Sequence, residues 1–465
     1  MVVARPAAVS RLVEALRRTL PADAVVTDGA GHDRAQRVWN GAVTARPAVV
    51  VRCASPADVG AAVRAAREAG VPLSVRGGGH DWAGRALTHG GLTIDLSGMR
   101  HVAVDPALEV ADVSAGATAA DVAAAAAPFG LAPVTGTAGS VGMAGLTLGG
   151  GYGPLGGRFG LALDNLLAAD VVLADGSAVT TDAEHEPELF WALRGGGGNF
   201  GVVTSMRLRL HTVPALRSGL VVFPWEQAGA VLAGLSDVLA DGPDELTVQS
   251  GVLAGPDGAP VVFASPTWSG DDAAAGERAL ARIDALGTPL VSQLGATTVP
   301  QMLAGIDAQF PFGRHVRIRT RSVPALTAGV QDALMLAGST LTSPLSAVSV
   351  HSLHGAASRV PVAQTAFGHR DPHLMIEIIA LWEPEDARAA EHGAWADDVT
   401  RALEPHALPG GYPNLLGPDD AARAAHAYGS HAERLLAAKR RFDPEGVFRA
   451  IALPDASPAD PEGAR

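Results

Sequence analysis

Cysteine is nearly absent from this chain. Its 465 residues include one cysteine, Cys53, which excludes a fold held together by disulfides and suits a reducing compartment. Positive charge is also scarce, because 35 Lys and Arg stand against 48 Asp and Glu and leave a net charge of -13. With no basic run in the sequence, this balance argues against nucleic-acid binding.

Long apolar runs are missing as well. No uninterrupted apolar stretch is long enough to span a bilayer. Charges interrupt the stretch MVVARPAAVSRLVEALRRTL, which predicts a short amphipathic helix rather than a signal peptide. We therefore expect a soluble, cytoplasmic protein with no membrane or nucleic-acid partner, and we identify no metal site.

The composition is otherwise that of a globular protein, with 48% hydrophobic and 18% charged residues. The length favours two domains or one large composite fold. Between residues 47 and 75 the pattern is strand, helix, strand, with Ser55 as the helix N-cap, Asp58 completing a capping box and Gly70 as the C-cap. Residues 167–180 alternate like a hairpin around the turn dipeptide Asp175-Gly176. After Val213 and Pro214, longer helical patterns alternate with strands, which predicts an antiparallel sheet covered on one side by helices. A last helix is expected over about 419–441, and the fold class is α+β.

Glycine is abundant, with 55 residues, and three glycine-rich loops lie in the first half. They are RGGGHD before residue 82, the stretch 135–153 and the run 195–198. Clustered backbone N–H groups in such loops bind anions, although a single glycine run often serves only as a tight turn. No helical pattern directly follows Gly145 to Gly153, so a nicotinamide-binding Rossmann domain is disfavoured.

Several motifs carry a family resemblance. SVRGGGHDWAG, GMAGLTLGGGYGPLGGRFGLALDNLLAADVVLADG, ELFWALRGGGGNFGVVT, GGYPNLLG and KRRFDPEGVF follow one another along nearly the whole chain. Together they resemble the PCMH-type FAD-binding domain of the vanillyl-alcohol-oxidase superfamily, and within it the berberine-bridge-enzyme-like oxidases. The similarity is strongest to the bacterial branch of 6-hydroxy-D-nicotine-oxidase-like and secondary-metabolite tailoring enzymes. It implies an FAD-binding domain in residues 1–210 and 409–465, and a substrate-binding domain in 211–408.

The resemblance also implies a cofactor, FAD, and the residues that hold it. His80 matches the position whose imidazole bonds covalently to the flavin 8α-methyl carbon; the alternative is a solvent-facing loop histidine bonded to Asp81. Ala138 stands where many members carry a second, cysteine link, so we expect a single attachment. The small side chain of Val141, at a position that controls oxygen access, fits an oxidase. Val203 would contact the adenine end. The other residues expected at FAD are Arg76, Gly77, Gly78, Gly79, Asp81, Thr137, Gly139, Ser140, Gly142, Gly145, Leu146, Gly149, Gly150, Tyr412 and Asn414.

The catalytic base is less clear from the sequence. Hydride transfer to a flavin usually needs a group that takes the substrate's hydroxyl or amine proton. We rank Tyr412 first, His354 second and Glu377 third; Tyr412 alternatively packs on the flavin, and Glu377 alternatively faces solvent. The alternation in SAVSVHSLHG puts Ser352 and His354 on one strand face and His351 on the other. Several relatives carry carboxylates at the positions that match Ser352 and His354. The alternating arginines 317, 319 and 321 either bind an anionic substrate or form a solvated face, and we favour the second interpretation.

These observations lead to one main hypothesis. The resemblance implies an FAD-dependent oxidase that removes a hydride from a small alcohol, amine or activated C–H metabolite and reduces O2 to H2O2. A same-fold flavin dehydrogenase with another electron acceptor is the first alternative, and a flavin- or ligand-binding protein that has lost catalysis is the second. A nicotinamide-dependent dehydrogenase comes last. The sequence leaves the substrate and the oligomeric state open.

Overall fold

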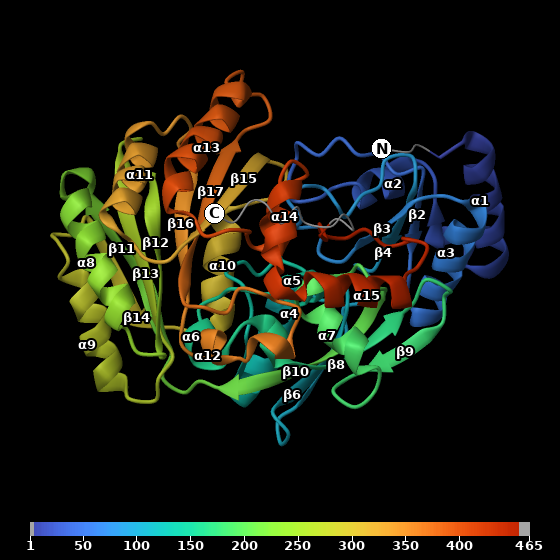
Figure 1. Cartoon of the computed structure of the whole chain (residues 1–465), viewed down its shortest axis with the longest axis horizontal. Coiled ribbons are helices and arrows are strands. Elements are labelled where there is room, and N and C mark those ends of the chain that lie inside the picture. The colour runs from blue at the N-terminus through green and yellow to red at the C-terminus, as the bar shows by residue number, and fades with distance from the viewer. Residues whose placement is uncertain (1–3, 455–465) are drawn as a thin grey trace.

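A computed structural model of the chain describes residues 4–454. The strands form three sheets, of four, six and seven strands, and helices cover them (Figure 1), which confirms the α+β fold class. The first two sheets use residues 25–212 and the third uses residues 217–382.

The four-stranded sheet lies near the N-terminus and has the order β1-β2-β4-β3, with β2, β4 and β3 parallel. A parallel connection needs a crossover, and α3 supplies it between β2 and β3. Ser55 and Asp58 form the predicted capping box at the start of α3, and Gly70 ends it with φ +66°. The elements of this part are α1 Pro6–Thr19, β1 Val25–Val26, α2 Gly29–Ala35, β2 Val49–Arg52, α3 Pro56–Ala69, β3 Leu73–Arg76 and β4 Leu92–Asp95.

The six-stranded sheet is antiparallel, with β10 at its centre between β6 and β8. Strands β8 and β9 form the hairpin predicted at Asp175 and Gly176, whose φ of +79° the turn requires. The elements here are β5 Val102–Asp105, β6 Val110–Ser114, α4 Ala119–Ala126, β7 Leu131–Pro133, α5 Met143–Gly149, α6 Gly156–Phe159, β8 Leu166–Val172, β9 Ala178–Thr181, α7 Pro187–Gly196 and β10 Val202–Thr212.

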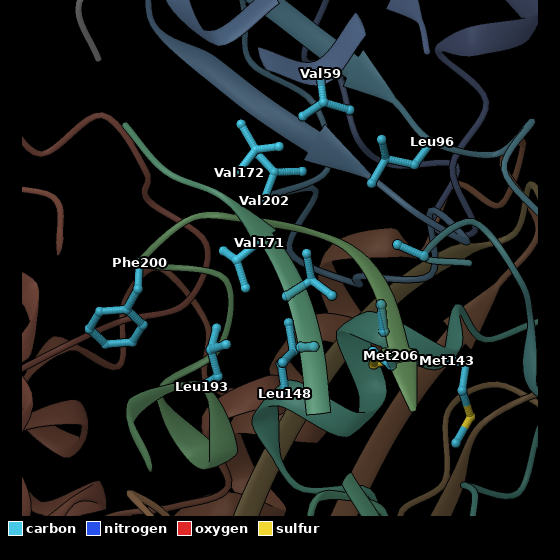
Figure 2. Packing of buried hydrophobic residues seen from close by; sticks show 14 of the residues in the cluster. Val59, Leu96, Met143, Leu148, Val171, Val172, Leu193, Phe200, Val202 and Met206 are labelled. Carbon is cyan, nitrogen blue, oxygen red and sulfur yellow. The ribbon is translucent and has the colours of Figure 1, made fainter. Parts of the chain in front are cut away.

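These two sheets share one hydrophobic core. Figure 2 shows Val59 of α3 and Leu96, just after β4, above Val171 of β8 and Val202 of β10, with Met143 of α5 on the other side. All five side chains are buried. The glycine-rich loops at the ends of these elements are therefore anchored on a continuous core, and this anchoring fixes their positions relative to one another.

The seven-stranded sheet is antiparallel, in the order β14-β11-β13-β12-β16-β17-β15. Its helices α8, α9, α11 and α13 cover one face (Figure 1), as the sequence predicted, and their contact with the sheet forms a second hydrophobic core. The elements are β11 Arg217–Pro224, α8 Ala228–Asp241, β12 Leu246–Ala254, β13 Pro260–Trp268, α9 Ala273–Asp284, β14 Val291–Ala296, α10 Val299–Gln309, β15 His315–Val323, α11 Ala328–Ser339, β16 Ala347–Leu353, α12 Ala356–Arg359, β17 His373–Trp382 and α13 Ala389–Leu403.

Two sequence-based expectations about helices were wrong. The stretch 135–153 was expected to be a loop, but it contains α5, because Met143 and Leu148 gain burial in the core when the segment is helical. The last helix was expected to be continuous, but it is two helices, α14 Ala421–Ala427 and α15 Ala432–Phe442. Gly429, with φ +49°, lies in the short turn between them.

The chain beyond α13 returns to the first half of the molecule, where Figure 1 shows α15 beside α7. The division at residues 210/211 and 408/409 stays a prediction, and residues 455–465 of its last segment lie outside the described residues. Among residues 4–454, no helix combines the length and the apolar character needed to cross a lipid bilayer.

Candidate active site

A cavity of about 1010 Å³ lies between the glycine loops of the first half and the uncovered face of the seven-stranded sheet. Among the segments of the first half that reach it are the loop after β3, the segment from 136 to α5, the start of β10 and the run at Gly197 and Gly198. Helix α10, which Figure 1 shows between the two halves, closes another side. Residues 412–415 and 448–451 arrive from the C-terminal segment.

Gly78 and Gly142 bring two of these loops into backbone contact. A Cβ placed on Gly78 would lie 2.4 Å from the amide nitrogen of Gly142, and the reverse substitution gives the same distance. Within residues 4–454, the amides of Gly77, Gly78 and Gly79 donate to no protein group. A row of amides without protein acceptors at a cavity wall is an anion-binding arrangement.

His80 follows this row and is held between aromatic rings. Its imidazole stacks on Trp39 with 4.4 Å between ring centroids and 16° between planes, and Phe312 meets it edge-on at 5.9 Å. Burial lowers the pKa of His80 to about 4, so the imidazole is neutral at neutral pH. Asp81 pairs with Arg85, at 2.6 Å between carboxylate and guanidinium, rather than with the His80 ring.

Most of the residues predicted at the cofactor line this cavity. They are Gly77, Gly78, Gly79, His80, Asp81, Thr137, Val141, Gly142, Gly145, Leu146, Val203, Tyr412 and Asn414. Ala138, at the position of the missing second link, lines it too.

Five predicted residues do not line the cavity, each for a visible reason. The Arg76 guanidinium turns away to the carbonyls of Ala35 and Arg37 and to Asp95. The remaining four are positions of close packing. Gly139 and Ser140 contact Asp307 of α10, whose carboxylate accepts hydrogen bonds from the Ser140 amide at 3.0 Å and from the Ser140 hydroxyl at 2.8 Å. Gly149 packs against the side chain of Asn414, and Gly150 packs against the side chain of Tyr412.

Tyr412 is fixed by these contacts. Its hydroxyl accepts hydrogen bonds from the Gly151 amide at 2.8 Å and from Asn414 Nδ2 at 3.1 Å. Two donors fill the acceptor sites of the phenol oxygen, so its own proton remains available for the cavity. Burial raises the pKa of Tyr412 to about 12 despite both donors, and the phenol is protonated at neutral pH. Tyr152 packs edge-on against it at 5.0 Å between centroids.

The sheet contributes a short polar chain on β12, β16 and β17. Gln249 donates to the Ser349 hydroxyl at 2.8 Å, and His351 Nε2 lies 3.0 Å from that hydroxyl. The same nitrogen lies 3.5 Å from a carboxylate oxygen of Glu377, whose strand neighbour across the β16–β17 ladder is Ser349. Among the described sheet residues that line the cavity, Glu377 is the one carboxylate.

His354 does not reach the cavity. Strand β16 ends at Leu353, and Gly355, with φ +58°, turns the chain away. The His354 ring packs on Gly157 of α6, where an added Cβ would lie 2.5 Å from Nε2, and its Nδ1 bonds to Ser352 at 3.0 Å. Ser352 lines the cavity, whereas Val350, two residues earlier on the strand, is buried in the helix-side core.

The arginines of β15 do not line the cavity either. Arg317 and Arg319 both bind Asp397 of α13, at 2.8 and 2.9 Å, and Arg321 binds Glu404 at 2.5 Å. They form ion pairs on the helix side of the sheet, so neither the anionic-substrate interpretation nor a freely solvated face describes them.

Sequence reasoning missed several residues of the cavity wall: Trp39, Tyr152, Gln249, Ser349, His351, Met302 and Ile306. The strand alternation separated His351 from His354, so choosing the other face would have found His351. Tyr152 lies inside the glycine motif. Nothing in the sequence around Gln249 or α10 signals a site.

A large cavity with an anion-binding glycine row on one wall and polar side chains on the opposite wall is typical of an enzyme that binds a dinucleotide cofactor. Residues 47–182 match the family model of the FAD binding domain. The chain is 32% identical to FAD-linked oxidoreductase aurO of Gibberella zeae, over 89% of this chain and 82% of that protein. It is also 32% identical to (R)-6-hydroxynicotine oxidase of Paenarthrobacter nicotinovorans, over 93% and 96%. The chain belongs to the family of FAD-linked oxidoreductases that includes (R)-6-hydroxynicotine oxidase.

Solved structures agree with this assignment. The crystal structure of 6-hydroxy-D-nicotine oxidase from Arthrobacter nicotinovorans superposes with a TM-score of 0.85 at 30% identity, over 93% of this chain and 98% of that one. Wild-type BBE-like 1 of Physcomitrella patens shares the fold, with a TM-score of 0.83 at 24% identity over 96% and 99% of the two chains. The cofactor is therefore FAD, and the residues present fit it. The unpartnered glycine amides suit its pyrophosphate, and the cavity exceeds what a small ligand alone would need.

Proposed function

We propose that this protein is an FAD-dependent oxidase that removes a hydride from a small alcohol, amine or activated C–H metabolite and reduces O2 to H2O2. The observation that carries the proposal is a single cavity that joins the glycine loops and His80 to Tyr412 and Glu377. FAD, when bound, supplies the acceptor for the substrate hydride and passes both electrons to O2. The small side chain of Val141 at the cavity wall supports O2 as the acceptor.

The proposed cofactor residues divide into two groups. The amides of Gly77 to Gly79 and the segment from Thr137 to Gly145 hold the pyrophosphate and the ring system, and Val203 contacts the adenine end. His80 forms the single covalent bond to the flavin, because Ala138 offers no thiol and Cys53 is buried in the core away from the cavity. A neutral imidazole is the nucleophilic form, and burial keeps His80 in that form.

Two side chains divide the proton chemistry. At neutral pH the Tyr412 hydroxyl donates a hydrogen bond to the reacting oxygen or nitrogen, since its acceptor sites are filled. The substrate O–H or N–H proton then goes to Glu377, the carboxylate of the sheet face, with His351 Nε2 3.5 Å from that carboxylate. This assignment reverses the sequence-based order, because a phenol with a pKa of about 12 is a weak candidate for a resting base.

Purification followed by acid precipitation tests the cofactor assignment. We expect a yellow pellet from the wild-type protein and a colourless one from His80→Ala. Covalent flavin in the His80→Ala pellet would refute the tether, and a wild-type protein without FAD would refute the whole proposal.

A panel of neutral alcohols and amines tests the reaction. We expect a substrate that bleaches the flavin without air and yields one H2O2 for each turnover in air. Bleaching without peroxide would establish the dehydrogenase alternative. No bleaching with any compound, in a protein loaded with FAD, would favour the binding protein.

A further inference from the structure

We infer that Trp39 is the positioning residue for the covalent tether: its indole face fixes the plane of the His80 ring and so aims the imidazole nitrogen at the flavin. The inference rests on the proposed His80 tether. It assigns a role in attachment to a residue of the loop after α2, far from the glycine motif in sequence.

The stack restricts where His80 can react. A ring separation of 4.4 Å with a 16° tilt is a parallel stack that covers one face of the imidazole. The lone pair of a neutral imidazole nitrogen lies in the ring plane, so the Trp39 plane sets the direction of attack. Phe312 meets the ring at 85° and limits its rotation from a second side.

Trp39 is itself held rigidly. Its indole N–H donates to the Phe310 carbonyl at 3.1 Å, and the side chain is buried. Its amide donates to the Gly79 carbonyl at 2.9 Å, and its carbonyl accepts from the Gly313 amide at 3.0 Å. The first of these backbone bonds joins Trp39 to the residue directly before His80, so the two rings cannot shift independently.

The loop that carries Trp39 is fastened to the substrate side as well. Asn40 donates to the carbonyls of Trp82 and Val316, at 2.6 and 2.9 Å, and accepts from the Val316 amide at 3.0 Å. Gly41 lies so close to Gly313 that a Cβ would stand 2.0 Å from its carbonyl oxygen. The aromatic slot around His80 therefore forms only when the loop after α10 is docked.

In the tethering step, a bond forms between an imidazole nitrogen and the 8α carbon, while a methyl C–H bond and the imidazole N–H bond break. Two protons and two electrons would thereby be released to the flavin ring, and O2, the acceptor of the proposed reaction, would take up both protons and both electrons to give H2O2. Such a step depends on alignment at close range, and misplacement by about 1 Å can cost roughly 100-fold in rate.

The chain contains a matched control. Phe159 stacks on His211 with 4.0 Å between centroids and the same 16° tilt, and neither residue lines the cavity. Removing that ring in Phe159→Leu removes an equivalent histidine stack without touching the site.

The experiment compares full-length wild-type, Trp39→Leu, Trp39→Phe, Phe159→Leu and His80→Ala proteins incubated with excess FAD. Total bound flavin is measured after gel filtration, and covalent flavin is measured over time as fluorescence of the denatured protein band. We expect Trp39→Leu to bind FAD but to attach it roughly 10- to 100-fold more slowly than the wild type. Trp39→Phe, which keeps an aromatic face, and Phe159→Leu should attach it at close to the wild-type rate.

Three results would overturn the inference: attachment at the wild-type rate in Trp39→Leu, equal slowing in Trp39→Phe, or loss of all FAD binding in Trp39→Leu. The last would assign Trp39 to the pocket rather than to the tether. Covalent flavin in His80→Ala is a separate failure, because it would remove the proposed tether itself.

Discussion

Replacing Gly78 by alanine tests whether the contact between the two glycine loops builds the cofactor site. The new Cβ would lie 2.4 Å from the Gly142 nitrogen, 2.7 Å from its Cα and 3.1 Å from the Ser140 carbonyl oxygen. All three neighbours are backbone atoms, and the first is a full ångström inside ordinary van der Waals contact, which begins at 3.4 Å. No side chain can rotate to make room, so one loop must move.

Overpacking of this kind costs about 1–3 kcal/mol in the free energy of unfolding. A decrease of roughly a few degrees in Tm is expected, together with a lower ratio of bound FAD to protein, because the moved loop carries the amides of Gly77 to Gly79. Differential scanning fluorimetry and flavin absorbance measure the two quantities.

Gly156→Ala is the control, since a Cβ on Gly156 has no neighbour within 4 Å and the residue does not line the cavity. It should leave Tm and FAD content unchanged or raise Tm slightly. A Gly78→Ala protein with wild-type Tm and FAD content would refute the reasoning, because the loops would then tolerate separation.

Three further predictions follow from charges and hydrogen bonds. Tyr412→Phe should lower kcat/KM by roughly 10- to 100-fold, because the variant lacks the hydroxyl that donates to the substrate. Burial raises the pKa of Tyr412 to about 12, so the substitution should not remove any ionisation seen in the pH profile of kcat/KM between about pH 6 and pH 9. Loss of an alkaline limb from that profile would contradict this prediction. Burial lowers the pKa of His211 and of His373 to about 4, below the value of 6.5 in the unfolded chain. Between these values the unfolded chain binds more protons than the folded protein, so Tm should fall as the pH decreases from about 7 to 5. The variant His373→Gln should weaken this dependence of Tm on pH, and an unchanged slope would contradict the prediction. Arg370 and Asp164 form a buried ion pair at 2.7 Å. Arg370→Met should lower the free energy of unfolding by about 3–5 kcal/mol, because it leaves the Asp164 carboxylate buried without a partner, and adding Asp164→Asn should recover part of that loss. An Arg370→Met protein as stable as the wild type would show that the ion pair is dispensable.

The parts of the fold that could be predicted are those with local signals. The Ser55–Asp58 capping box, the Gly70 cap and the Asp175–Gly176 turn each depend on neighbouring residues, and the structure contains all three. Helix α5 could not be predicted, since glycine lowers helix propensity by about 1 kcal/mol per residue. The burial of Met143 and Leu148 outweighs that preference, and only the complete core provides it.

The candidate site divides in the same way. Each glycine-rich segment is one continuous stretch of sequence, and the sequence analysis identified all three. The cavity wall on the sheet side, in contrast, consists of alternate residues from separate strands. Alternation defines two faces of β16 but does not say which one meets the cavity, and for that reason His354 was ranked as a candidate base and His351 was not. Trp39 reaches His80 from a loop that contains no recognisable motif.

Charge on the two faces of the seven-stranded sheet bears on the substrate. The three arginines of β15 are paired with three carboxylates, those of Asp397, Asp419 and Glu404. Among the described residues, no lysine or arginine of the sheet lines the cavity, and the two arginines that do, Arg85 and Arg449, belong to the loops of the cofactor side and the C-terminal segment. An anionic group over this sheet would meet Glu377 with no cation from the sheet to balance it. A neutral alcohol or an amine meets no such repulsion. The absence of sheet cations from this wall therefore supports the proposed substrates and the proposed role of Glu377 as the acceptor of their proton.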